Sequence, residues 1–198
     1  MLYWLFSCAL HTPIEPKQFN PDRLANVVCK ESNAQRRRHG YTALNNNPIL
    51  TEAARVYALE LQKDLFFDHT HPTNENLREP KDRVYAVGGK NPNVSENIAR
   101  ITLIQVPLAQ DNVVILDAKQ YLFAHEQGGK PIPMHSYRSY GKAVVQAWLD
   151  SPGHRRNLLH KDANAIGCAH AIIDRSGGVP MVVSVQLFQH GETLRMKK

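Results

Sequence analysis

The amino-acid sequence predicts an α+β fold in which helices cover a small antiparallel sheet. An apolar stripe over 48–66 indicates an amphipathic helix, and further helix-start signals stand at 20–21 and 151–152. Two alternating apolar segments near the end, 166–172 and 181–187, indicate a β-hairpin. Helices come first and in the middle and strands follow, which favours the α+β class.

The first two helices begin with the same signal. Asn20-Pro21 and Asn47-Pro48 each combine a capping side chain with a proline at the first helical position. The first helix is predicted over 21–39 and ends at Gly40. The second is predicted over 48–66, where the apolar stripe comprises Leu50, Ala53, Ala54, Tyr57, Ala58, Leu61 and Leu65.

The middle of the chain is predicted to alternate irregular and regular structure. Residues 68–95 are rich in Asp, His, Pro, Asn and Gly, which indicates a long connection that carries a short helix at 82–84. A strand is expected over 95–104. Residues 105–135 then form an excursion with a hairpin, from apolar runs at 113–116 and 120–124 and a turn signal at 127–130.

The last third predicts two helices and the closing hairpin. Val144, Val145, Trp148 and Leu149 share one side of a helix over 139–150. Ser151-Pro152 restarts a short helix, with Ser151 as N-cap. The hairpin strands turn at 174–178.

Composition and charge exclude several classes of protein. The chain of 198 residues, with 42% hydrophobic and 21% charged residues, suits one folded domain, and no apolar run is long enough to span a bilayer. The net charge is +6, and its strongest cluster is Arg36-Arg37-Arg38 with His39. This cluster could bind phosphates or anionic lipids. It could also be the solvated end of a helix, where basic side chains are favoured. No nucleic-acid motif accompanies the cluster, so we expect no nucleic-acid partner. We also expect the protein to be a monomer.

The N-terminal segment resembles a targeting sequence. Residues 1–10 are apolar but lack a basic start, and Leu5-Phe6-Ser7-Cys8 is similar to a degraded lipoprotein box. A lipid on Cys8 would attach the chain to a membrane; a start that truncates a longer signal explains the segment equally well. We therefore expect residues 1–18 to be a signal remnant, lipoprotein-type or disordered segment, followed by one domain over 19–198. Cys29 and Cys168 could pair or remain isolated buried thiols.

Three polar segments could carry chemistry. They are Phe67-Asp68-His69-Thr70-His71, Ser95-Glu96-Asn97 and the run from Trp148 to Leu159 that contains His154. Imidazole and carboxylate groups suit zinc and general acid–base work. Each segment alone has an ordinary structural explanation.

Together these segments resemble the bacterial CAP domain (the cysteine-rich secretory, antigen 5 and pathogenesis-related-1 type). The resemblance covers roughly 22–190 and includes Asn33, Arg37 or Arg38, Gly40, Leu44, Leu50, Ala53, Ala54, Ala58, Ile166-Gly167 and Val185-Gln186-Leu187-Phe188. It implies a three-layer α-β-α sandwich, secretion or attachment to the cell envelope, and a cleft with two histidines and two acids. His69, Glu96 and His154 match three of these positions. In some members the histidines bind zinc or another divalent metal, so His69 and His154 are the expected ligands, with support from Glu96 and His71.

The sequence also departs from the family pattern. Ser95 stands where the family usually has Gly, and the second acid falls on Ser151, with Asp150 and Glu126 as weak substitutes. A complete four-residue site is therefore not expected.

Three functions remain open at this point. The first is a binding module whose cleft holds a small apolar ligand or lipid, a peptide or a cell-envelope component, with or without a metal. The second is a metal-assisted hydrolase or protease in which Glu96 or His154 activates water. The third is a structural role, in which the polar residues organise the 68–95 connection through buried hydrogen bonds.

Overall fold

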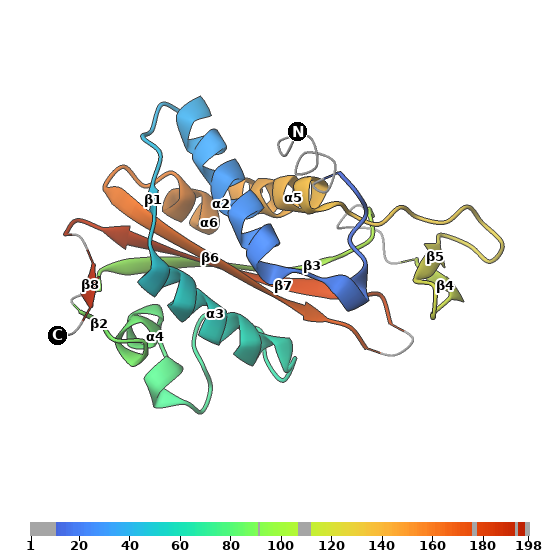
Figure 1. The fold of residues 1–198 in the computed structure, drawn as a ribbon, viewed down its shortest axis with the longest axis horizontal. Coiled ribbons are helices and arrows are strands. Elements are labelled where there is room, and N and C mark those ends of the chain that lie inside the picture. Colours follow the sequence, from blue (N-terminus) through green and yellow to red (C-terminus); the bar gives the residue numbers. More distant parts are fainter. Residues whose placement is uncertain (1–10, 91, 107–111, 176–177, 193, 197–198) are drawn as a thin grey trace, which may run out of the picture.

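A four-stranded sheet forms the middle layer of the molecule (Figure 1). Its strands are β1 (Asn45–Asn46), β6 (Ala163–Ile173), β7 (Met181–His190) and β3 (Val94–Thr102), in the order β1-β6-β7-β3. The β6–β7 and β7–β3 pairs are antiparallel, whereas the short β1 runs parallel to β6. In this computed structural model the described residues are 11–90, 92–106, 112–175, 178–192 and 194–196.

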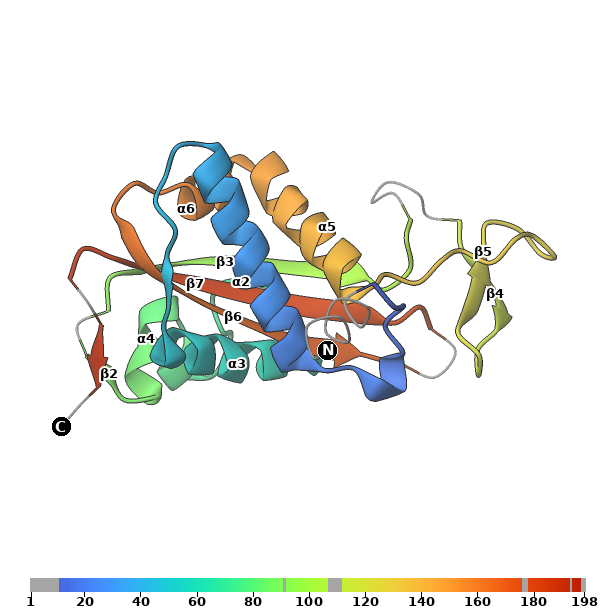
Figure 2. The ribbon, with the colours of Figure 1, turned by 45° about the horizontal axis from the view of Figure 1, so that its top comes forward.

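Helices cover both faces of this sheet, as Figure 2 shows. On one side lie α2 (Pro21–Arg38), α5 (Tyr137–Asp150) and α6 (Pro152–Leu158); on the other lie α3 (Pro48–Gln62) and α4 (Pro80–Ala86). Each side has its own apolar core, one built around Trp148 and Phe188 and the other around Tyr57 and Leu187. The α+β class and the three-layer sandwich are therefore confirmed.

The helix starts follow the predicted caps. The Asn20 side chain accepts a hydrogen bond from the Arg23 N–H, and that of Asn47 accepts from Ile49 and Leu50. The apolar stripe of α3 is fully buried from Leu50 to Leu61. The prediction that α3 extends to 66 is wrong, because the helix ends at Gln62 and the Leu65 side chain is 84% exposed.

The early end of α3 coincides with a change of backbone conformation and with ion pairs to distant residues. Asp64 adopts a left-handed backbone conformation with φ of 56°. Its carboxylate pairs with Arg100 of β3 and with Arg175 beyond β6. The left-handed residue turns the chain two residues after the helix, and the ion pairs hold Asp64 in place, so Leu65 does not continue the stripe.

Glycine permits the closest approach between a helix and the sheet. A Cβ on Gly167 of β6 would collide with the backbone of Leu50 and Thr51 in α3. The helix therefore rests directly on the strand at this point.

A disulfide joins the two cysteines whose pairing the sequence did not decide. Cys29 of α2 is bonded to Cys168 of β6, with their Cα atoms 6.2 Å apart. The bond ties a helix layer to the sheet across a sequence separation of 139 residues.

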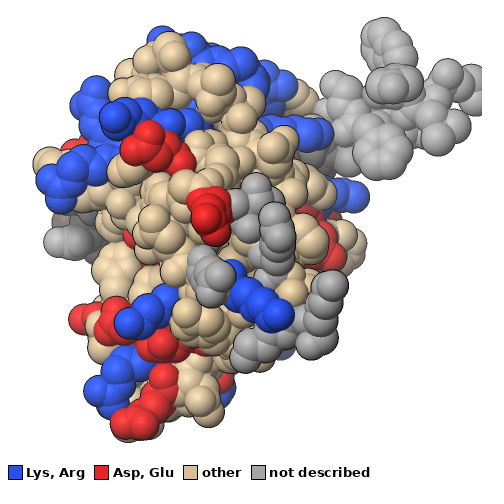
Figure 3. Space-filling model, turned by 90° about the vertical axis from the view of Figure 1, so that its left-hand side faces the viewer, with Lys and Arg blue, Asp and Glu red and all other residues tan. Residues whose placement is uncertain are grey.

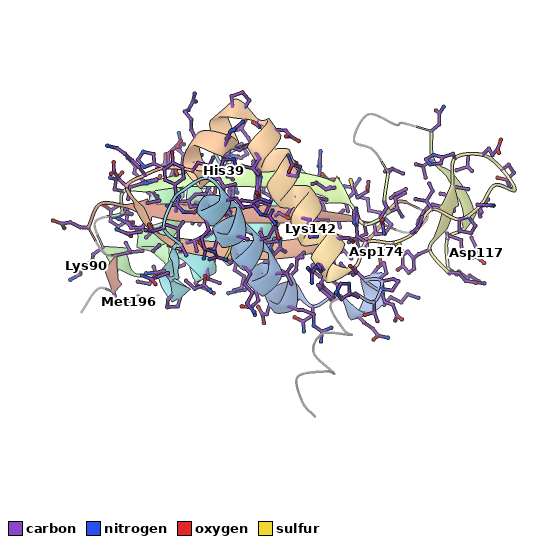
Figure 4. All side chains as sticks on the ribbon, turned by 90° about the horizontal axis from the view of Figure 1, so that it is seen from above. His39, Lys90, Asp117, Lys142, Asp174 and Met196 are labelled. Atoms are coloured by element: carbon purple, nitrogen blue, oxygen red, sulfur yellow. A yellow bond between two sulfur atoms is a disulfide. The ribbon has the colours of Figure 1, made fainter. Side chains whose placement is uncertain are left out.

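The predicted excursion contains the predicted hairpin. Strands β4 (Val114–Asp117) and β5 (Leu122–Ala124) pair antiparallel, and the 126–129 turn follows β5. The hairpin has a small core of its own, in which Phe123 packs near Ile104 and Ile132. Seen from above, Asp117 of the hairpin lies at the opposite end of the molecule from Lys90 and Met196 (Figure 4). Lys90 and Met196 belong to a two-stranded sheet in which β2 (Gly89–Lys90) pairs antiparallel with β8 (Arg195–Met196).

The packed part of the chain starts ahead of residue 19, where the sequence analysis drew the boundary. Ile14 is 1% exposed, and its N–H donates to the His135 carbonyl. A 3-10 helix, η1 (Pro16–Gln18), leads into α2. Cys8 lies outside the described residues. None of the described helices is long and apolar enough to cross a membrane.

Candidate functional site

The site is built on β3, the edge strand of the sheet, from Glu96. Glu96 shares a face of β3 with Ile98, which packs in the core beneath α3. The Glu96 side chain is 1% exposed, and each of its carboxylate oxygens has a partner. His69 Nδ1 lies 2.9 Å from Oε1, and the Arg83 guanidinium pairs with Oε2. Glu96 is thus positioned to orient His69, and not to meet a ligand itself.

Arg83 of α4 fixes the connection that carries His69. The connection contains η2 (Glu75–Leu77), and the fully buried Arg83 side chain donates to the carbonyls of His69, Leu77 and Arg78. Its guanidinium also lies over the Tyr57 ring, 3.1 Å from the centroid. The connection is held at three carbonyls, so His69 sits on a rigid support.

Tyr57 adds a further tie from α3. Its hydroxyl donates to the Asp68 carbonyl at 2.6 Å, next to His69 in the chain. Burial raises the pKa of Tyr57 above its usual range, which keeps the hydroxyl protonated for this bond.

His154 reaches the same edge from the opposite helix layer. Its imidazole centroid lies 5.9 Å from that of His69. Two asparagines tie α6 to β3: Asn97 Nδ2 donates to the His154 carbonyl at 3.1 Å, and Asn157 Nδ2 donates to the Glu96 carbonyl at 2.9 Å. The structure therefore brings His69, Glu96 and His154 together from separate parts of the chain.

The two imidazoles differ in electrostatics. The hydrogen bond to Glu96 raises the pKa of His69, outweighing the opposing effect of partial burial. Burial and the neighbouring His69 lower the pKa of His154, against a smaller opposing effect of Glu96. Because Glu96 is acceptor-only when ionised, it receives the Nδ1–H of His69 and leaves the Nε2 lone pair available on the half-exposed ring.

His71 belongs to a different set of contacts. It is buried, and its Nδ1 accepts from the N–H groups of Thr73 and Asn74 at 3.2 and 2.9 Å. Its Nε2 lies 3.6 Å from a Glu60 carboxylate oxygen. Both nitrogens face protein groups, so His71 organises the loop. The prediction had given it a supporting role in metal binding.

The spacing of His69 and His154 is compatible with two ligands of one metal ion, and the described residues add no third ligand. Zinc–nitrogen bonds of about 2 Å in a tetrahedral site place two imidazole centroids about 5 Å apart, close to the observed 5.9 Å. The described residues include no group of three or more His, Cys, Asp or Glu arranged to hold a metal. His69 and His154 would supply two ligands, and solvent or a bound molecule would have to supply the rest.

The second acid of the family pattern has no clear substitute. Asp150, at the end of α5, accepts from Gln146 at 2.8 Å and lines a hollow that does not include His69, Glu96 or His154. Glu126 lies in the turn after β5. Ser151 caps α6.

Sequence reasoning missed the residues that support the histidines. Arg83 was placed in a short helix without a role, and Tyr57 was assigned only to the apolar stripe. Their signal is weak, because an arginine after two polar residues is typical of a solvated helix. Asn157 stood within the motif that carries His154 but had no assigned contact.

Comparisons with known proteins identify the family of the chain. The model of the cysteine-rich secretory protein family (CAP) matches residues 30–188. YkwD of Bacillus subtilis (strain 168) is 24% identical over 143 residues, which are 72% of this chain and 40% of that protein.

Two solved structures share the fold. An extracellular protein containing an SCP domain from Bacillus anthracis aligns with a TM-score of 0.55 and 20% identity, over 91% of this chain and 45% of that chain. An outer surface protein from Borrelia burgdorferi aligns with a TM-score of 0.52 and 16% identity, over 91% of this chain and 99% of that chain. The chain thus spans less than half of YkwD and of the Bacillus anthracis protein.

Proposed function

Because this chain belongs to the cysteine-rich secretory protein (CAP) family, we propose that it is a binding module whose ligand contacts the His69–His154 pair through a divalent metal ion such as zinc. The observation that carries the proposal is the bond between His69 Nδ1 and the buried Glu96 carboxylate. A histidine that donates its other ring N–H to a carboxylate is the usual arrangement around a metal-bound imidazole.

The residues of the site have two different roles, metal ligation and positioning of a ligand. His69 and His154 are the proposed ligands through their neutral imidazoles; the depressed pKa of His154 favours this form, whereas the raised pKa of His69 means that a metal must displace a proton there at lower pH. Glu96 and Arg83 fix the ring of His69. A metal bound there would offer its remaining positions to an oxygen or nitrogen of a small apolar molecule or lipid, a peptide or a cell-envelope component.

Two features support secretion or attachment to the cell envelope. The Cys29–Cys168 disulfide suits an oxidising compartment. Relatives with the same fold are described as an extracellular protein and an outer surface protein. A lipid on Cys8 would be one means of attachment.

Calorimetric titration of dialysed protein with zinc tests the proposal. We expect binding that the double variant His69→Ala/His154→Ala loses, and that Glu96→Gln weakens by about 10- to 100-fold. The matched control is His39→Ala/His125→Ala, which removes two exposed histidines elsewhere and should bind as the parent does.

Zinc binding that is equal in the parent and in His69→Ala/His154→Ala would refute the metal site. A lower melting temperature of Glu96→Gln with unchanged zinc affinity would favour the structural role of the Arg83–Glu96–His69 set instead.

Hydrolysis is a second candidate, favoured by the opposite pKa shifts of the two histidines. Since both oxygens of Glu96 are engaged, His154 is the better base. Turnover of a peptide or ester substrate that His154→Ala abolishes and His39→Ala retains would establish this function.

A further inference from the structure

A second candidate site lies in a surface hollow between the end of α2 and α6. The hollow has a volume of about 570 Å³, and none of His69, Glu96 and His154 lines it. Its walls combine basic side chains with apolar and aromatic ones: Arg155, Arg156, His160, Tyr41, Leu149 and Leu159. This size lies within the range of small-molecule sites.

The two arginines of the hollow have free guanidinium groups. Both side chains are exposed, and no ion pair among the described residues involves Arg155 or Arg156. Arginine presents its donors in a planar fork that matches the oxygens of phosphate.

A third positive charge lies behind the wall of the hollow. Arg36 of α2 is fully buried and donates to the carbonyls of Thr42, Leu158 and His160. Its Nη2 has no hydrogen-bond partner, and the guanidinium lies 5.5 Å from the centroid of the Tyr41 ring. No carboxylate among the described residues pairs with this buried cation, which is compensated by carbonyl dipoles and by the Tyr41 ring.

The surroundings add to this positive field. Figure 3 shows Lys and Arg side chains gathered in the upper part of one end of the molecule, where the end of α2 lies in Figure 1. Arg37 and Arg38 are exposed there. Asp150 is the one acidic residue that lines the hollow, and its negative charge partly opposes the binding of an anion.

We propose that this hollow binds a small phosphate ester with an aromatic or apolar organic group. Arg155 and Arg156 bind the phosphate oxygens, and Tyr41, Leu149 and Leu159 contact the organic group. The site does not overlap the histidine pair, because the two share no lining residue, although His154 and the two arginines all lie on α6.

Calorimetry with phenyl phosphate as the probe tests this site. We expect binding at low salt that the double variant Arg155→Gln/Arg156→Gln weakens by about tenfold or more. The matched control, Arg37→Gln/Arg38→Gln, removes the same charge nearby but outside the hollow, and should change the affinity by less than about threefold. Asp150→Asn should tighten binding, because it removes the one opposing charge.

Four further measurements complete the test. Inorganic phosphate should bind more weakly than phenyl phosphate, and Tyr41→Ala should reduce this difference. The variant His69→Ala/His154→Ala should bind phenyl phosphate as the parent does, and Arg155→Gln/Arg156→Gln should keep its zinc affinity, so either site can fail without the other.

Equal weakening in the two arginine pairs would overturn the proposal, because it would show a general charge effect. No binding of phenyl phosphate would overturn it too, and binding to phosphatidylglycerol vesicles in that case would assign the basic face to a membrane surface instead.

Discussion

His170 shows how one buried side chain can link stability to pH. It lies in β6 with 3% exposure, and its Nδ1 is 2.9 Å from Ser184 Oγ. Its Nε2 is buried without a hydrogen-bond partner. Burial lowers the pKa of His170 to about 3, so the imidazole is neutral in the folded protein.

We expect stability to fall as the pH is lowered below the unfolded-state pKa of 6.5. Between this value and the folded-state pKa the unfolded chain binds the extra proton, so His170 removes about 2 kcal/mol of unfolding free energy from pH 6.5 to pH 5. Urea unfolding at several pH values measures this loss. His170→Gln keeps a hydrogen-bonding group without a titration in this range.

The slope of stability against pH should therefore be shallower in His170→Gln than in the parent. Since His135 and His190 also have lowered pKa values, some slope should remain in the variant. Identical slopes would mean that His170 does not carry the effect.

The sequence predicted individual residues only where a motif names them. His69, Glu96 and His154 were singled out through the family resemblance, and the structure places them at one edge. Arg83 had no assigned role, and Arg36 stood in a basic cluster interpreted as a solvated helix end or a contact for anions, yet both are fully buried and bind carbonyl groups. Burial of a charged side chain depends on which loops fold over it, and a local pattern contains no such information.

At the scale of elements, the contact between α3 and β6 depends on the missing side chain of Gly167. Gly167→Ala should lower the unfolding free energy by about 1–3 kcal/mol, because the added methyl group meets the backbone of Leu50 and Thr51. Chemical denaturation measures this change.

Gly153→Ala is the matched control for this prediction. Gly153 lies within α6 with open space around it, so alanine there should raise stability by about 0.5 kcal/mol. A parent-like stability of Gly167→Ala would show that α3 can move away from the sheet at little cost.

Elements with strong periodicity were predicted well, and their ends less well. Apolar residues at helical spacing identified α3 and α5, and alternating apolar residues identified β6 and β7. The end of α3 was missed because Asp64 pairs with arginines that are distant in the chain. The two-residue β1 is too short for any pattern, and only its parallel register with β6 defines it.

At the scale of the whole molecule, the disulfide is the longest covalent constraint. Cross-linking across 139 residues restricts the unfolded chain by about 5 kcal/mol in the chain-entropy model. Cys29→Ala/Cys168→Ala should therefore unfold at a clearly lower urea concentration than the oxidised parent.

A reducing agent provides the control for this constraint. It should lower the unfolding midpoint of the parent and leave that of the double variant unchanged. A parent whose midpoint is insensitive to reductant would contradict a stabilising role for the bond.

The strand order β1-β6-β7-β3 governs how the chain can fold during its synthesis. Every ladder of the sheet contains β6 or β7, which begin at residues 163 and 181. A nascent chain that has not yet reached Ala163 therefore holds helices without a sheet to pack on, and the sheet can form only after β6 and β7 have been synthesised.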